Sequence, residues 1–112
     1  MTIENWSDNV LLVELADDPQ FTDDMNSVLE TVGIREDLDV VINLQSVTFV
    51  NSSNIAKLLK LRKTLVARQR KLRLCAISTH VWGVFLVMGL DKIFDVYNDV
   101  ATGLASLHFS DK

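Results

Sequence analysis

The chain has 112 residues, of which 48% are hydrophobic, enough for one domain with a substantial core. Its net charge of −4, with no aromatic residues interleaved among the basic ones, argues against nucleic-acid binding. The single cysteine excludes an internal disulfide, and no apolar run reaches the roughly 18 residues that a membrane span needs. The first ten residues lack the basic and apolar regions of a signal peptide, so we expect a cytoplasmic protein.

The first forty residues predict a hairpin and a helix. Residues 3–6 and 10–15 have the pattern of two strands, separated by a turn cluster at residues 7–9. Thr22 is the expected N-cap of the helix, and Gly33 is its expected C-terminal stop. The predicted buried face of this helix consists of Met25, Val28, Leu29 and Val32. The neighbouring acid pairs, Asp17-Asp18 and Asp23-Asp24, are expected to be solvated loop and helix-start residues.

Residues 40–65 contain a strand, a polar turn and an amphipathic helix. Val40, Val41 and Ile42 are β-branched and apolar, which is typical of a strand covered on both faces. A second short extended run is predicted at residues 47–50. Four small polar residues at positions 51–54 then favour a helix start, because their side-chain oxygens accept hydrogen bonds from the free N–H groups of the first turn.

The helix that follows this turn has two distinct sides. Its apolar side is predicted to pack on a sheet and consists of Ile55, Leu58, Leu59, Leu61, Leu65 and Val66. Its opposite side is predicted to face water and consists of Lys57, Lys60, Lys63, Thr64 and Arg68. Arg62 projects from the apolar side, so we expect its charged end to extend to the edge of that side.

The last forty residues add two strands and two helices. Residues 72–77 and 93–97 are predicted strands, and residues 81–88 form a helix capped by Ser78 or Thr79 and ended by Gly89. Asn98 or Asp99 opens a terminal helix with Val100, Leu104 and Leu107 on one face. The order β-β-α-β-α-β-α-β-α predicts a single α/β domain over residues 1–112, with a mixed, mostly parallel sheet.

Charge is unevenly distributed along the chain. Residues 1–39 hold eleven of the fifteen acidic residues, whereas residues 40–73 hold eight of the eleven basic residues and no acidic one. One interpretation is that solvated faces simply differ in sign. The other is that the basic side of the central helix meets an acidic partner.

Sequence motifs of catalysis, metal binding and phosphate binding are absent. Neither glycine-rich phosphate loop occurs, nor do CxxC or HExxH, so we expect no enzyme activity, cofactor or metal site. His80 and His108 are expected at the surface, and Cys75 is expected to be a buried, unreactive thiol. Trp82, Phe85 and Met88 belong to a helix that is apolar nearly all round, so they either pack in the core or form an exposed contact surface.

Three segments, VVINLQSVTFVNSSNIAKLL, LRLCAIS and VWGVFLVMGLDKIFDVYND, resemble the STAS domain family of bacterial anti-sigma factor antagonists. That family carries an apolar strand, a short strand and then Asp-Ser-Ser/Thr-Gly-Leu opening a helix. The residues that match the pattern are Leu44, Ser52, Ser53, Ile55, Gly89 and Leu90. Asn51 replaces the aspartate that precedes the serine in the family, Asn54 replaces the glycine, and Asn43 stands where another aspartate is common.

The resemblance implies a non-enzymatic module that docks a partner through the turn at residues 51–54 and the adjacent helix. The implied partner is a kinase-type anti-sigma factor, with a PP2C-type phosphatase as a possible second one. By position, the implied phosphate acceptor is Ser52 rather than Ser53. The residues expected to contact the partner are Asn51, Ser52, Ser53, Asn54, Lys57 and Lys60.

Two alternatives remain open at this point. The first keeps the fold without phosphorylation, as a constitutive STAS scaffold or a transporter-associated subunit. The second is a nucleotide-binding domain or enzyme, against which the absent motifs argue.

Overall fold

The computed structural model describes residues 3–109, and the order of their elements matches the predicted one. A short 3₁₀ helix, η1, is added before the last strand. In chain order, the elements are β1 (Ile3–Ser7), β2 (Val10–Ala16), α1 (Gln20–Ile34), β3 (Asp39–Ser46), α2 (Ser52–Ala67), β4 (Leu72–Cys75), α3 (Thr79–Met88), η1 (Leu90–Lys92), β5 (Asp95–Tyr97) and α4 (Val100–Phe109).

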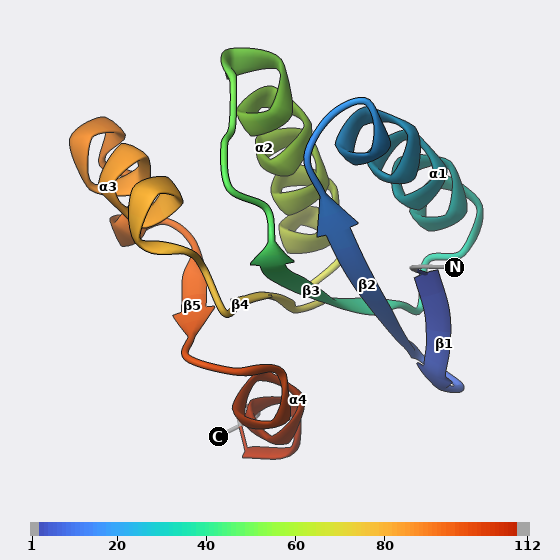
Figure 1. Cartoon of the computed structure of the whole chain (residues 1–112). Helices are drawn as coiled ribbons and strands as arrows, with labels where there is room; N and C mark the ends of the chain where they lie inside the picture. Colours follow the sequence, from blue (N-terminus) through green and yellow to red (C-terminus); the bar gives the residue numbers. More distant parts are fainter. Residues whose placement is uncertain (1–2, 110–112) are drawn as a thin grey trace.

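The five strands form one mixed sheet in the spatial order β1-β2-β3-β4-β5 (Figure 1). β1 pairs with β2 as an antiparallel hairpin, and all other neighbours are parallel. The register aligns Val13 with Ile42, and Ile42 with Leu74. The predicted mixed, mostly parallel sheet is therefore confirmed.

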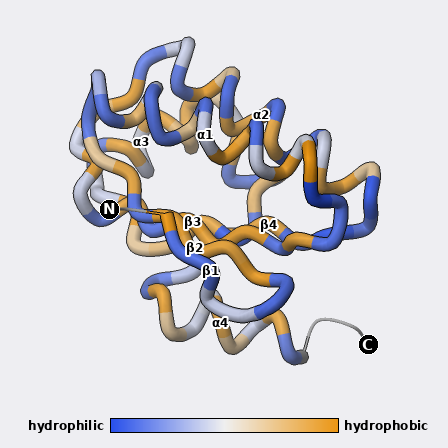
Figure 2. The backbone as a smooth tube through the Cα atoms, turned by 90° about the vertical axis from the view of Figure 1, so that its right-hand side faces the viewer, coloured by the Kyte–Doolittle hydropathy of each residue, from blue (hydrophilic) through white to orange (hydrophobic). Residues whose placement is uncertain are grey.

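Helices cover both faces of the sheet unequally, with α1, α2 and α3 on one face and α4 on the other (Figure 2). Strand residues alternate between the two faces, so Leu11, Val13 and Leu15 of β2 join the main core under α1 to α3. The smaller core under α4 is built from Val10, Val41 and Cys75, with partly buried Leu12, Tyr97, Val100, Leu104 and Leu107 around them. No helix in the described range has the length and apolar character that crossing a bilayer requires.

Close packing of α4 on β4 depends on Gly103. A Cβ atom at this position would lie 2.3 Å from the Cys75 Sγ, so any larger residue would push the helix off the sheet. The Cys75 thiol is buried as predicted, and its pKa is raised to about 11, first by burial and then by the nearby charge of Asp99.

The predicted ends of α1 were wrong on both sides. The helix begins at Gln20 after Pro19, and Thr22 lies within its first turn rather than at the cap. Gly33 does not stop the helix, which continues to Ile34 and is followed by extended backbone at Arg35. Thr22 fails as a cap because its hydroxyl donates to Asp18, four residues before it, instead of accepting a hydrogen bond in the helix.

The ends of two predicted strands also differ from the structure, and the extended run predicted at residues 47–50 lies outside the sheet. The backbone N–H groups of Thr48 and Phe49 donate to a side chain, described below, instead of to a neighbouring strand. β4 ends at Cys75 because the next residue, Ala76, has a left-handed φ of 60°. β5 starts at Asp95 rather than at residue 93, since the chain before it belongs to η1 and its cap.

The buried stripe of α2 is narrower than predicted. Ile55, Leu58, Leu61 and Leu65 are buried, but Leu59 and Val66 are 36% and 54% exposed. Each exposed residue follows a buried leucine by one position, which is about 100° further round the helix. Arg62 reaches the edge of this stripe, where its Nε donates to the Ile93 carbonyl over 2.8 Å.

Candidate functional site

The turn between β3 and α2 is closed by two asparagines that cap each other. Asn51 is the N-cap of α2, and its side-chain oxygen accepts a hydrogen bond from the Asn54 backbone N–H over 2.8 Å. In return, the Asn54 side-chain oxygen accepts from the Asn51 backbone N–H over 3.0 Å. This reciprocal capping box fixes the start of the helix and leaves Ser52 and Ser53 between the two caps.

Asp18, from the loop between β2 and α1, joins both asparagines from outside the turn. Its Oδ2 accepts hydrogen bonds from Nδ2 of Asn54 at 3.0 Å and from Nδ2 of Asn51 at 3.2 Å. Its Oδ1 accepts from the hydroxyl and the backbone N–H of Thr22. These donors, the Thr22 hydroxyl first, lower the pKa of Asp18 to about 2. The carboxylate is therefore ionised at neutral pH.

Asp17 accepts hydrogen bonds from the segment just before the turn, at Thr48 and Phe49. Its carboxylate accepts hydrogen bonds from the Thr48 hydroxyl at 2.5 Å, the Thr48 backbone N–H at 2.8 Å and the Phe49 backbone N–H at 3.3 Å. The hydrogen bond from the Thr48 side chain is the main reason that the pKa of Asp17 is lowered. Asp17 and Asp18 lie in a loop as predicted, and Asp18 is exposed, but both carboxylates also hold the β3–α2 segment through hydrogen bonds that the sequence did not predict.

The predicted contact residues of the turn divide into exposed and buried ones. Asn51, Ser52 and Ser53 are exposed, whereas Asn54 is only 1% exposed because its side chain lies between Asn51 and Asp18. Neither serine hydroxyl makes a hydrogen bond within residues 3–109. The turn therefore presents two unengaged hydroxyls at the first turn of α2, where backbone N–H groups have no partner within the helix.

The basic side of α2 is smaller than the sequence predicted. Lys60 and Lys63 are exposed, and Lys57 is half-buried beside them. Arg68 does not belong to this side, since its Nη1 donates to the Val32 and Arg35 carbonyls at the end of α1. We call the lysines at positions 57, 60 and 63 the lysine face; within the described chain none of them has an ion pair.

All five arginines hold parts of the fold together, unlike the lysines of α2. Arg35 binds Asp37 and the Asp8 carbonyl, and Arg62 binds the Ile93 carbonyl. Arg70 pairs with Asp39, and Arg73 binds Asp95 and Ser106. The fifth, Arg68, binds α1 as stated above. The eight basic residues in 40–73 thus consist of four structural arginines, the three lysines of the lysine face and Lys71.

An apolar surface connects the turn to α3. The exposed Phe49 ring stacks with the His80 ring, with 6.5 Å between centroids and 16° between planes. Val87 and Met88, further along α3, are 88% and 53% exposed. Of the three residues considered in the sequence, Met88 is thus at the surface, Phe85 is fully buried and Trp82 is partly buried.

The two acids and Phe49 are the site residues that the sequence reasoning missed. A signal for the acids was present, because β2 and β3 are parallel neighbours and their carboxyl ends meet at one edge of the sheet. Residues following β2 were therefore bound to lie near those following β3. The two histidines lie in α3 and α4, and no cluster of metal-ligating side chains occurs within residues 3–109.

Comparisons with known proteins agree with this architecture. A sequence model of the STAS domain family matches residues 12–103. An anti-sigma-factor antagonist (STAS) domain protein from Planctomyces limnophilus has 19% identity and a TM-score of 0.82, with 96% of this chain and 99% of that chain covered. The STAS domain of a SulP transporter from Vibrio cholerae has 14% identity and a TM-score of 0.79, with 95% and 86% covered.

A third solved structure is the Bacillus cell fate determinant SpoIIAA in its phosphorylated form. It has 17% identity and a TM-score of 0.66, with 85% of this chain and 88% of that chain covered. At these identities the likeness concerns the fold. No curated protein matches the chain.

Proposed function

Because the chain belongs to the STAS domain family, we propose that it is a non-enzymatic module that binds a partner protein through the β3–α2 turn and α2. The proposed partner is a kinase-type anti-sigma factor, and a PP2C-type phosphatase is a second one. Asn51, Ser52, Ser53, Lys57 and Lys60 form the proposed contact surface, with Asn54 supporting it from beneath.

The observation that carries this proposal is the pair of exposed, unengaged serine hydroxyls on a turn whose two flanking asparagines are held by hydrogen bonds. Four side chains, Asp17, Asp18, Asn51 and Asn54, hold the backbone around them. The side chains of these four residues fix the shape of the turn, and the two serine hydroxyls remain available for hydrogen bonds to a partner. The lysine face beside it adds charge complementarity for an acidic partner surface.

Ser52 is the proposed phosphate acceptor, since it matches the family position and is exposed. A phosphate there would add a charge of about −1.5 to −2 to a contact surface, and its desolvation would weaken docking. The N-terminus of a helix favours an anion, so the same phosphate would not unfold the domain. The switch would therefore act on binding and not on folding.

A second candidate is a constitutive scaffold or transporter-associated subunit without phosphorylation. Asn51 favours it, because this position of the turn carries an amide in place of the family's carboxylate and that amide is used to bind Asp18. The likeness to the fold of a SulP transporter domain agrees with this candidate as well.

The two candidates are separated by partner capture combined with phosphosite mapping. Wild-type protein, Ser52→Asp and Ser53→Asp are used as baits in extract of the native cell, after their melting temperatures are shown to agree. We expect a partner that Ser52→Asp loses and Ser53→Asp keeps, and phosphate on Ser52 by mass spectrometry. Phosphate only on Ser53 or on neither serine, with equal capture by all three baits, would favour the scaffold.

A further inference from the structure

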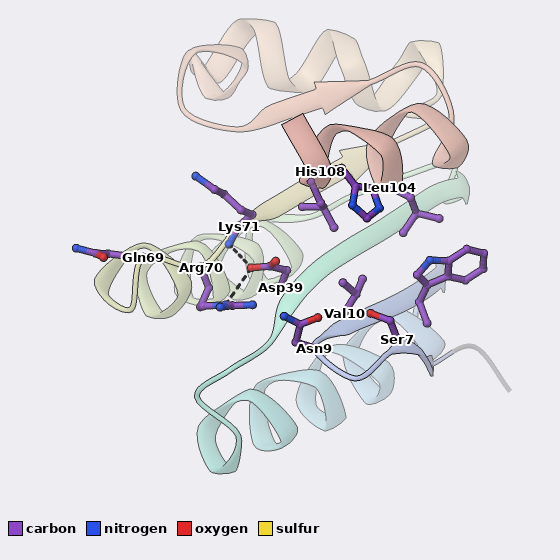
Figure 3. A pocket seen from close by; sticks show the side chains of 11 residues that line it. Ser7, Asn9, Val10, Asp39, Gln69, Arg70, Lys71, Leu104 and His108 are labelled. Carbon is purple, nitrogen blue, oxygen red and sulfur yellow. Dashed lines mark hydrogen bonds and ion pairs between the residues drawn. The ribbon is translucent and has the colours of Figure 1, made fainter. Parts of the chain in front are cut away.

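A cavity of about 300 Å³ lies at the end of α2 that is remote from the turn. Its lining comes from β1 and the β1–β2 turn, the start of β3, the α2–β4 turn and α4 (Figure 3). The volume is at the lower end of the range of small-molecule pockets in proteins. Nothing in the proposed docking function uses this cavity.

One side of the cavity is apolar. Trp6 lines it and is 55% exposed, an unusual exposure for the largest apolar side chain in a short edge strand. Val10 from the sheet and Leu104 and Leu107 from α4 complete this side. The surface is suited to a flat ring, because an indole prefers stacked or edge-on aromatic neighbours.

The other side of the cavity is polar and contains the carboxylate of Asp39, which is ion-paired with Arg70. Oδ1 of Asp39 lies 3.0 Å from Nε of Arg70 and accepts a hydrogen bond from the Lys71 backbone N–H over 2.8 Å. Both contacts use the same oxygen, and within the described chain Oδ2 has no hydrogen bond or ion pair. The cavity therefore offers an acceptor that lacks a donor, next to an arginine that is already paired.

Further polar groups surround this acceptor. The Asn9 amide, the Ser7 hydroxyl and the His108 imidazole line the cavity and make no side-chain hydrogen bonds within residues 3–109. In contrast, the side chains of Gln69 and Lys71 extend away from the other labelled residues (Figure 3).

We infer that this cavity binds a planar nitrogen heterocycle that donates N–H hydrogen bonds. The ring would lie against Trp6 and the α4 leucines, and its N–H group would donate to Oδ2 of Asp39. Asn9 and His108 are placed to pair with the remaining ring nitrogens. At this position an anionic group would be repelled by the Asp39 carboxylate, whereas an N–H donor is attracted to it.

Titration of the ¹⁵N-labelled protein with adenine, followed by NMR, tests the inference, and benzoate serves as an anionic probe of similar shape. We expect saturable binding of adenine with a Kd at or below about 1 mM. The shifts should fall on Asn9, Asp39 and Lys71, and benzoate should produce no saturable shift at these residues.

Two exposed aromatic residues provide a matched pair of variants. Trp6→Ala should weaken adenine binding by roughly tenfold or more, whereas Phe49→Ala, which removes an equally exposed ring elsewhere, should leave it unchanged. Equal or tighter binding of benzoate, equal effects of the two variants, or no saturable shift with adenine would each overturn the inference.

Discussion

The side-chain amide nitrogen of Asn54 lies 3.0 Å from the Asp18 carboxylate and thereby joins two loops whose contacting residues are 36 positions apart. Because Asn54 also caps Asn51, one buried side chain connects the start of α2 to the start of α1. The geometry of the exposed serines depends on this connection, and it leads to the first two predictions.

Acid stability should depend on Asp18. Its pKa in the folded protein, about 2, lies below the ordinary value of 3.8, so the fold favours the ionised form. The resulting stability is fully present above pH 3.8 and is lost as the pH falls through about 2. In Asp18→Asn, the free energy of unfolding should therefore fall less steeply over this range. Urea denaturation at a series of pH values measures it, and parallel curves for the two proteins would contradict the prediction.

Replacing Asn54 should destabilise the turn. Asn54→Ala removes the acceptor of the Asn51 backbone N–H and one donor to Asp18, so we expect a loss of about 1–2 kcal/mol. Ser53→Ala, which removes an exposed hydroxyl next to it, is the control and should change stability by less than about 0.5 kcal/mol. Equal effects of the two changes in chemical denaturation would show that the asparagine contributes no more than the serine.

The sequence predicted the order of elements and the buried stripe of α2 because both follow from periodic patterns of apolar residues. Exposure of Leu59 and Val66 was not predicted, since the width of a buried stripe depends on how closely the neighbouring elements approach. Residues 47–50 have a strand-like composition, but the backbone N–H groups of Thr48 and Phe49 donate to the Asp17 carboxylate, 31 and 32 positions away, and are not available for strand pairing. The position of the serines was predictable from the motif, whereas the acids that support them required the sheet order.

Packing of α4 should be sensitive to the size of residue 103. Gly103→Ala places a methyl group against Cys75 Sγ and should cost about 1–3 kcal/mol in unfolding free energy. The matched change Gly83→Ala, in α3, meets nothing within 4 Å and should stabilise the protein by up to about 1 kcal/mol. Adding Cys75→Ala to Gly103→Ala should recover part of the loss. A neutral Gly103→Ala would mean that α4 can shift on the sheet without cost.

The lysine face should act on the rate of partner association. Lys57→Glu with Lys60→Glu should leave folding intact and lower the association rate at low salt by about tenfold, because charge steering acts mainly on the on-rate. Kinetics with the captured partner at two ionic strengths would show it. Lys60→Glu and Lys92→Glu change the net charge equally, so their comparison controls for overall charge. Identical rates for these two single variants would mean that the lysines of α2 serve only solubility.

Hydrogen bonds from the β3–α2 segment to Asp17 and Asp18 also bear on the thermodynamics of the proposed docking. A loop that becomes ordered on binding loses conformational entropy, and this loss reduces affinity. Here the segment from Thr48 to Asn54 is held in one conformation by the protein itself before any partner arrives. The docking that we propose at this turn would therefore not require the segment to fold, and its affinity would depend on the contacts formed.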